Sequence, residues 1–163
     1  MNKTVNLSDS LGDRMKLAYE QAYRIFLPKR MPVIIRVDGK AFHTLTRKYR
    51  KPYDGLFSSF MDKAAQALMR EIEGAQVAYV QSDEISVFVH NYKRFTSESW
   101  FGNNIQKMVS VSAAIATEAF NKAGNESAYF DSRVFVLPEA EVNNYFVWRQ
   151  QDAVRNSIQS LAQ

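Results

Sequence analysis

The chain has 163 residues, of which 46% are hydrophobic and 23% charged, with a formal net charge of +4 and a pI near 9.3. This length and composition suit one globular domain over residues 1–163 with its own hydrophobic core, and they argue against disorder. The absence of cysteine excludes disulfides and thiolate metal sites, and without a long apolar run or a signal peptide we expect a cytoplasmic protein with no membrane partner.

The first half of the chain alternates between helical and strand-like patterns. Apolar residues at helical spacing, after a possible N-cap at Ser8, predict a helix over residues 8–26. The β-branched run "VIIRVD" predicts a buried strand over residues 33–38. After a basic segment, Asp54 is expected to cap a second helix that ends by Gly74.

The second half predicts a hairpin, a long helix, a strand and a final helix. The hairpin strands are "VAYVQ" at 77–81 and "EISVFV" at 84–89, with a turn at Ser82 and Asp83 between them. The remaining elements are a helix from Thr96 or Ser97 to Gly124, a strand over residues 129–138, and a helix from Glu139 onward.

Apart from the outer helices, the order is strand, helix, strand, strand, helix, strand, which is typical of the ferredoxin-like α+β fold. Right-handed crossovers place the third strand between the first and second, and the fourth outside the first, so that all neighbours are antiparallel. The end of the first strand then lies beside the start of the third, on strands about 4.8 Å apart. Asp38 therefore meets Asp83 and Glu84 at one edge of the sheet.

This convergence of carboxylates points to a metal site. Carboxylates at such a short distance repel one another unless a cation lies between them. Mg²⁺ is commonly bound by one or two carboxylates together with substrate phosphates. Gly39 lacks a Cβ, so its carbonyl could approach a metal or a phosphate closely. Taken singly, Asp38-Gly39 and Asp83 read as ordinary turn residues. Taken jointly, with this strand order, they favour a two-metal phosphoryl-transfer site.

Basic residues follow the first strand directly. They could hold a triphosphate or an RNA backbone, or they could simply form a solvated loop. These cations are Lys40, Arg47, Lys48, Arg50 and Lys51. Lys107 in "NNIQKMVS" could likewise act on phosphates as a point charge, although a lone helical lysine is usually a surface residue.

Several spaced motifs follow one another along the chain. They are "MPVIIRVDGKAFHTLT", "KPYD", "AYVQSDEISVFV", "WFGNNIQKMVSVSAAIATEAFN", "FDSRVFVLP" and "YFVWRQQDAVRNSIQ". Together they cover most of the chain and resemble the tRNA(His) guanylyltransferase family, specifically the guanylyltransferase-like 3′–5′ polymerases of bacteria, archaea and phages. The resemblance implies a polymerase-like palm domain.

The resemblance also implies an activity. The family adds nucleotides to the 5′ end of tRNA after ATP or GTP activates a 5′-monophosphate, or directly on a 5′-triphosphate. The 3′-hydroxyl of the incoming nucleotide then attacks the activated end. The implied cofactor is Mg²⁺, two per site, and the implied partners are tRNA, nucleoside triphosphates and further copies of the chain in a homotetramer.

Site residues follow from the matching motifs. Asp38 and Asp83 would be the carboxylate metal ligands, Gly39 would add its carbonyl, and Glu84 stands beside them as a further catalytic candidate. The nucleotide contacts that the resemblance implies are Gly39, Lys40, Ala41, Phe42, His43, Lys51, Ser82, Asn104, Lys107 and Arg133.

Two departures from the family pattern refine these expectations. Val154 stands where eukaryotic members have a histidine, which favours templated repair of 5′-truncated tRNA over obligatory addition of one guanosine. Family members also continue beyond the segment that ends here at Gln163, so we expect this chain to lack the family's C-terminal extension.

Two other classes of function remain open on the residues alone. One is a non-catalytic RNA- or nucleotide-binding module on a ferredoxin-like sheet, which would stack bases on exposed aromatic side chains. The other keeps the palm and the carboxylates but performs nucleotide cyclisation or ordinary 5′–3′ synthesis.

Overall fold

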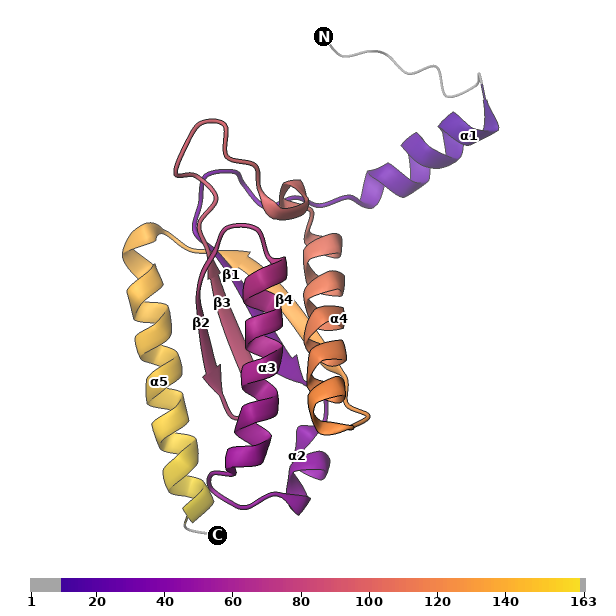
Figure 1. The fold of residues 1–163 in the computed structure, drawn as a ribbon. Helices are drawn as coiled ribbons and strands as arrows, with labels where there is room; N and C mark the ends of the chain where they lie inside the picture. The colour runs from indigo at the N-terminus through magenta and orange to yellow at the C-terminus, as the bar shows by residue number, and fades with distance from the viewer. Residues whose placement is uncertain (1–9, 162–163) are drawn as a thin grey trace.

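The computed structural model describes residues 10–161, with side chains described through residue 159, as a four-stranded sheet packed against helices (Figure 1). The strands are β1 (Val33–Gly39), β2 (Ala75–Gln81), β3 (Glu84–Val89) and β4 (Phe130–Val136). The helices are α1 (Leu11–Arg14), α2 (Phe42–Leu45), α3 (Gly55–Glu71), α4 (Ile105–Gly124) and α5 (Glu139–Leu161).

The sheet has the strand order β2-β3-β1-β4, and each neighbouring pair is antiparallel. This confirms the predicted ferredoxin-like βαββαβ topology, with additional helical segments before β1 and after β4. The hairpin strand β3 begins and ends at the predicted residues, and Asp54 caps α3 by accepting hydrogen bonds from the amides of Leu56 and Phe57.

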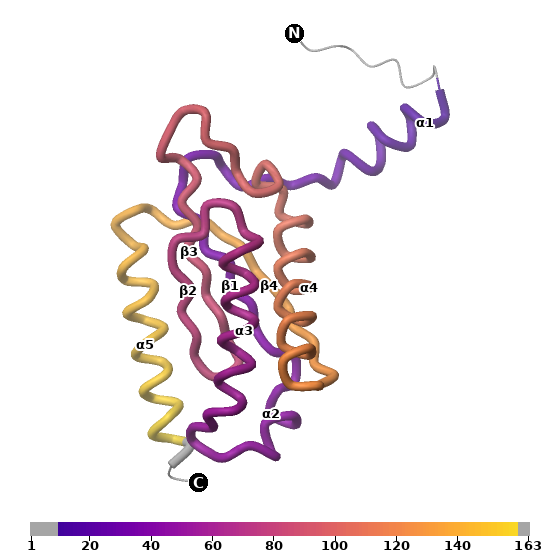
Figure 2. The backbone as a smooth tube through the Cα atoms, in the orientation of Figure 1, coloured from indigo at the N-terminus to yellow at the C-terminus, as the bar shows by residue number. Residues whose placement is uncertain are grey.

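Alternating residues of β1 face two different layers. Val33, Ile35 and Val37 are fully buried in the core that α3 and α4 cover. Arg36 and Asp38 point to the opposite face, because successive side chains of a strand alternate. Figure 2 shows α3 in front of the strands and α5 alongside the edge strand β2. Tyr145 and Arg149 of α5 bond to Ser86 and Glu84 of β3.

The core next to the end of β1 is aromatic. The Phe42 ring contacts those of Phe57, Phe120 and Phe130, with centroids 5.0–6.2 Å apart. All four are buried, and each contributes about 2–3 kcal/mol by leaving water. This cluster therefore fixes α2 against α3, α4 and β4, beside the last residues of β1.

The long helix α4 begins later than the sequence pattern predicts. Phe101, Gly102 and Asn103 have positive φ angles of 51°, 59° and 65°, which an α-helix cannot accommodate. The helix starts only at Ile105, where the Asn104 side chain accepts a hydrogen bond from the Lys107 amide. The predicted start at Thr96 or Ser97 is therefore wrong.

The N-terminal segment also differs from the single helix predicted over residues 8–26. After α1 the chain passes through a π-helical turn at Met15–Glu20 and a 3₁₀ turn at Gln21–Tyr23. The predicted cap Ser8 lies outside the described residues, and Ser10 caps α1 instead. Leu11, Met15, Tyr19 and Tyr23 are exposed, and Figure 1 shows the segment projecting away from the sheet.

The described helices include none that is both long and apolar enough to cross a membrane.

Candidate active site

The ends of β1 and β3 bring the two predicted metal ligands to one place. The Gly39 amide donates a hydrogen bond to the Asp83 carbonyl at 3.0 Å, and Asp38 is paired with Glu84 across the β1–β3 ladder. Asp83 occupies the two-residue turn between β2 and β3, next to Ser82, whose φ of 49° is left-handed. The tight hairpin thus holds Asp83 beside the Asp38-Gly39 peptide.

Both carboxyl groups are less acidic than a free aspartate. Burial raises the pKa of Asp38, and the negative charges of Asp83, Asp131 and Glu84 raise it further, against a lowering by Arg133. Burial also raises the pKa of Asp83, opposed by hydrogen bonds from its own amide and from Ser82. These two groups would gain from a cation, because a cation offsets both desolvation and repulsion.

A third carboxylate lies on the other side of Asp38. Asp131 of β4 is directly opposite Asp38 in the β1–β4 ladder. Arg133 links the two: its Nη2 lies 3.2 Å from Asp131 Oδ1 and 3.9 Å from Asp38 Oδ2. Arg133, a predicted nucleotide contact, is about half exposed and so remains accessible to a ligand as well.

Glu84 has a different environment from the two aspartates. It is buried, and Arg149 of α5 binds both of its oxygens, through Nε at 2.8 Å and Nη2 at 2.9 Å. Arg36 Nε lies 3.6 Å from Glu84 Oε2. Because both oxygens are occupied, Glu84 is placed to anchor α5 to the sheet rather than to offer a free ligand.

The predicted nucleotide-binding segment starts at the same edge. Lys40, Ala41 and His43 are exposed, and Ala41 has a left-handed φ of 56° where the chain turns into α2. The Phe42 ring is buried in the core, which leaves only its backbone for a nucleotide contact. Lys51 is exposed further along the segment.

A hollow of about 430 Å³ adjoins this turn, between the segment after β1 and the turn that precedes β4. Lys40 and Arg47 line it together with Tyr129, whose carbonyl accepts a hydrogen bond from the Lys40 amide at 2.8 Å. Its size is within the range of small-molecule sites. It is a candidate nucleotide pocket, because Lys40, two residues after Asp38, lines it.

One charged cluster fixes the wall of this hollow. Lys48 Nζ lies 2.6 Å and 2.8 Å from the two oxygens of Glu126, and the Tyr49 hydroxyl donates to Glu126 at 2.5 Å. Burial and the bond to Glu126 raise the pKa of Tyr49 to about 12. The cluster thus ties the basic segment to the α4–β4 turn.

The structure does not bring Asn104 and Lys107 to this edge. Asn104 forms a β-bridge with Phe26, and the neighbouring Asn103 carbonyl accepts a hydrogen bond from the Leu27 amide, so both belong to the end where β1 begins. Asp38 is at the other end of β1, a strand about 20 Å long. The Asn104 side chain is used to cap α4, while Lys107 is exposed.

Sequence reasoning did not single out Arg36, Arg149 or Glu126. Arg36 could have been found, because a cation inside the apolar run "VIIRVD" requires a buried acidic partner. In α5, Trp148 is 48% exposed, whereas its neighbour Arg149 is buried. Nothing in the local pattern marks Glu126, because its partners are far away in the sequence.

Within residues 10–159, no three His, Asp or Glu side chains are grouped as a ready-made metal site. Asp38 and Asp83 nevertheless fit a divalent cation by their chemistry: both are oxygen ligands with raised pKa values at one turn. Mg²⁺ commonly takes its remaining ligands from water and substrate phosphates.

The chain is similar to known proteins in sequence and in fold. Residues 12–138 match the family model described as Thg1: tRNAHis guanylyltransferase. A bacterial tRNA(His) guanylyltransferase (Thg1)-like protein in complex with GTP has a TM-score of 0.91 and 52% identity, covering 95% of this chain and 76% of that one. A second such bacterial structure, in complex with ATP, has a TM-score of 0.91 and 50% identity, covering 94% of this chain and 70% of that one.

Among curated relatives, the probable tRNA(His) guanylyltransferase of Homo sapiens is 33% identical over 77% of this chain and 45% of its own length. The chain spans about half the length of most of the curated relatives it matches. The α+β sheet is accordingly the palm-like fold of these structures. The chain belongs to the tRNA(His) guanylyltransferase family.

Proposed function

We propose that the protein is a nucleotidyltransferase that adds nucleotides to the 5′ end of tRNA in the 3′–5′ direction. The observation that carries this proposal is the placement of Asp38 and Asp83 at one turn, joined by the hydrogen bond from Gly39 to Asp83. The relatives with GTP and ATP complexes support nucleoside triphosphates as substrates. Val154, in place of a histidine, favours templated repair of truncated tRNA.

In this proposal Asp38, Asp83 and the Gly39 carbonyl hold Mg²⁺, two ions per site. When bound, the ions would supply Lewis-acid stabilisation of the attacking and leaving oxygens of a phosphoryl displacement. The desolvation that raises the pKa of both aspartates would make their carboxylates strong ligands for a cation. Arg149 pairs with Glu84, the residue that follows Asp83, and holds it in place.

The reaction has two displacements. The 5′-phosphate of the RNA attacks the α-phosphorus of ATP or GTP, which forms a phosphoanhydride and releases pyrophosphate. The 3′-hydroxyl of the incoming nucleotide then attacks the activated 5′-phosphorus, loses its proton, and displaces the nucleoside monophosphate. Lys40 and Arg47, which line the hollow beside Gly39, would position the triphosphate. Arg133 is near enough to Asp38 to neutralise charge that develops there.

Asn104 and Lys107 need a separate role, since they lie at the opposite end of β1. We propose that they contact a phosphate other than those at Asp38, either on the RNA or in the site of another copy of the chain. A homotetramer belongs to the same proposal. The exposed Leu11, Tyr19 and Tyr23 of the N-terminal segment offer apolar surface for such assembly, and analytical ultracentrifugation measures it.

A non-catalytic RNA-binding module is less consistent with the sheet. Such modules stack bases on aromatics of an open sheet face. Here α5 packs Tyr145 and Arg149 over that face, where Tyr145 bonds to Ser86 and Arg149 to Glu84. The covered face leaves no aromatic platform over β3 in the described chain.

The test offers a 5′-truncated tRNA bearing a labelled 5′-monophosphate, with ATP, each nucleoside triphosphate and Mg²⁺. Addition at the 5′ end makes the label resistant to phosphatase and lengthens the RNA. The Asp83→Asn variant, checked for folding by circular dichroism, serves as the control and should add nothing. Growth only at the 3′ end, or no growth by a folded wild-type chain, would discard the proposal.

A further inference from the structure

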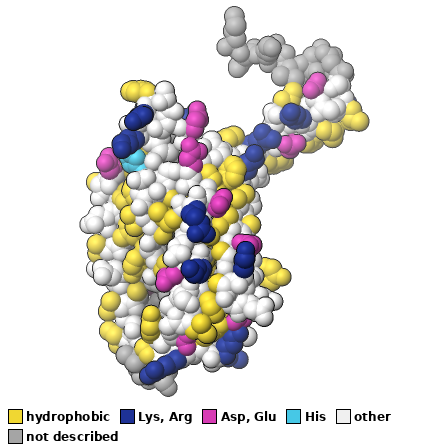
Figure 3. All heavy atoms as spheres, viewed as in Figure 1, with side chains coloured by type: hydrophobic (Ala, Val, Ile, Leu, Met, Phe, Trp, Pro, Cys, Tyr) yellow, Lys and Arg dark blue, Asp and Glu magenta, His cyan; other side chains and the backbone are white. Residues whose placement is uncertain are grey.

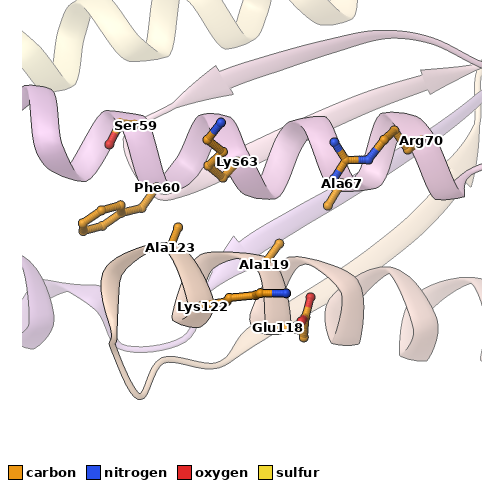
Figure 4. Close-up of a pocket in the computed structure, with 9 residues that line it drawn as sticks. All are labelled: Ser59, Phe60, Lys63, Ala67, Arg70, Glu118, Ala119, Lys122 and Ala123. Carbon is orange, nitrogen blue, oxygen red and sulfur yellow. The ribbon is translucent and has the colours of Figure 1, made fainter.

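A shallow groove lies on the outer surface of the helical layer, between α3 and α4 (Figure 4). Its volume is about 410 Å³. Alanines at positions 67, 119 and 123 line it, and their small side chains let another molecule approach the two helices closely. None of the predicted catalytic or nucleotide-binding residues takes part in it.

The rim of the groove is basic. Lys63 and Arg70 of α3 are seven residues apart, two helical turns, so they project from the same face of the helix about 10 Å apart along its axis. Lys122 of α4 faces them, with Glu118 one turn earlier as the single carboxylate of the lining (Figure 4). The lining thus carries three cations and one anion.

These cations are not used within the fold. Among the described residues, Lys63, Arg70 and Lys122 have no carboxylate oxygen within 4.0 Å, unlike Lys48 and Arg149. All three side chains are exposed. Figure 3, in the orientation of Figure 1, shows Lys and Arg side chains on this face of the molecule. Exposed, unpaired cations around a floor of small residues complement a phosphodiester chain.

The position of the groove relates it to the candidate active site. The segment from Lys40 to Asp54 runs directly from the end of β1 to the start of α3, and it carries Arg47, Arg50 and Lys51. The C-terminal end of α4 lies at the same end of the sheet, because Asn121 bonds to Ala128 just before β4. Basic residues therefore occur both in the segment that follows Asp38 and along the groove.

We propose that the α3–α4 groove binds the sugar–phosphate backbone of the RNA whose 5′ end is held at Asp38 and Asp83. The inference rests on the proposed function and extends it to a second contact on the same substrate. Phosphate contacts position a nucleic acid without reading its sequence. The groove then sets the affinity for tRNA and leaves nucleotide affinity and the chemical step unchanged.

The test compares two double variants that each remove two positive charges. Lys63→Ala with Lys122→Ala alters the groove. Lys93→Ala with Arg94→Ala alters exposed residues after β3, at the end of the sheet opposite Asp83. Binding of a fluorescent tRNA transcript to the full chain is measured from 50 to 200 mM salt, roughly the range over which phosphate contacts are lost. Nucleotide addition gives KM for tRNA, KM for GTP and kcat.

For the groove variant we expect tRNA affinity to fall about three- to tenfold and the slope of log K against log[salt] to become shallower by about 1.5. KM for tRNA should rise by the same factor, while KM for GTP and kcat stay constant. The control should bind as the wild type does. Equal weakening in both variants would mean a net-charge effect and would overturn the proposal.

Sedimentation velocity of both variants separates RNA from other occupants. If the groove variant changes only its oligomeric state, with tRNA affinity unchanged, a second copy of the chain occupies the groove and the proposal is wrong. The binding experiment needs no catalysis. Failure of nucleotide addition by the wild type therefore contradicts the proposed function. The RNA-binding measurement still tests whether the groove binds RNA.

Discussion

The Gly39 amide donates a hydrogen bond to the Asp83 carbonyl at 3.0 Å, although 43 residues separate the two positions in the chain. This single bond extends the β1–β3 ladder by one step, beyond the pair Asp38 and Glu84. It determines that the residue after Asp38 faces the residue before Glu84. The candidate metal ligands are therefore positioned by backbone pairing, which does not use their carboxylates.

Gly39 should tolerate no side chain. A Cβ at this position would lie 2.4–2.6 Å from three atoms of the buried Phe42 ring. We expect Gly39→Ala to lower the free energy of unfolding by about 2 kcal/mol, because the ring must leave its place in the aromatic cluster. Chemical denaturation measures the loss.

Gly55→Ala is the matched control for that substitution. Gly55 starts α3, and a Cβ there would meet nothing within 4 Å. Alanine should therefore be neutral or stabilise the chain by up to about 1 kcal/mol. Equal destabilisation by both substitutions would show that the contact with Phe42 does not determine the choice of glycine at position 39.

The Asp38 side chain should destabilise the folded chain at neutral pH. Its pKa is raised by burial and by its acidic neighbours, so the folded chain holds the proton more tightly than the unfolded chain. Stability then falls as pH rises from the ordinary aspartate pKa through the raised one. Asp38→Asn should abolish nucleotide addition and raise the Tm at pH 7 by about 2–4 °C. A lower Tm than wild type at pH 7 would contradict this explanation.

Arg149 should be among the most sensitive positions away from the two aspartates. Arg149→Ala leaves the buried Glu84 carboxylate without its two shortest hydrogen bonds. The expected cost is about 3–5 kcal/mol, by urea denaturation. The double variant Arg149→Met with Glu84→Met removes both charges of the pair and should recover part of that loss, because Arg36 then lacks its acidic neighbour. If the free-energy change of the double variant equals the sum of the changes of the two single variants, the two residues do not act as a pair.

Glu126 should stabilise the wall of the nucleotide hollow in a pH-dependent way. Hydrogen bonds from Lys48 and Tyr49 lower its pKa, so its contribution is present above the ordinary glutamate pKa and is lost as pH falls through the lowered value. Glu126→Gln should cost about 1 kcal/mol at pH 7 and nothing in acid. Thermal unfolding at several pH values measures the difference, and a pH-independent loss would contradict it.

The strand order and the meeting of Asp38 with Asp83 could be predicted from the sequence because both follow from simple rules. Alternating and β-branched runs locate the strands, and crossover handedness fixes their order. The start of α4 could not be predicted in this way. Three consecutive positive φ values at Phe101–Asn103 are stabilised by tertiary contacts, among them the bonds from Asn103 to Leu27 and Pro28.

The role of Glu84 shows a similar limit. Its position beside Asp83 predicts a further catalytic carboxylate, and only the approach of α5 reveals that Arg149 binds both of its oxygens. Spacing within one motif cannot predict which distant helix will cover it. The position of Lys107 illustrates the same point, since the motif that contains it lies at the opposite end of the sheet from Asp38.

The most direct test of the central claim is Mn²⁺ binding, followed by electron paramagnetic resonance, with and without a non-hydrolysable GTP analogue. The analogue should increase the number of tightly bound Mn²⁺ ions to about two per chain. Asp38→Asn and Asp83→Asn should each abolish this increase while the chain stays folded. Unchanged Mn²⁺ binding in both variants would contradict a metal site shared by Asp38 and Asp83.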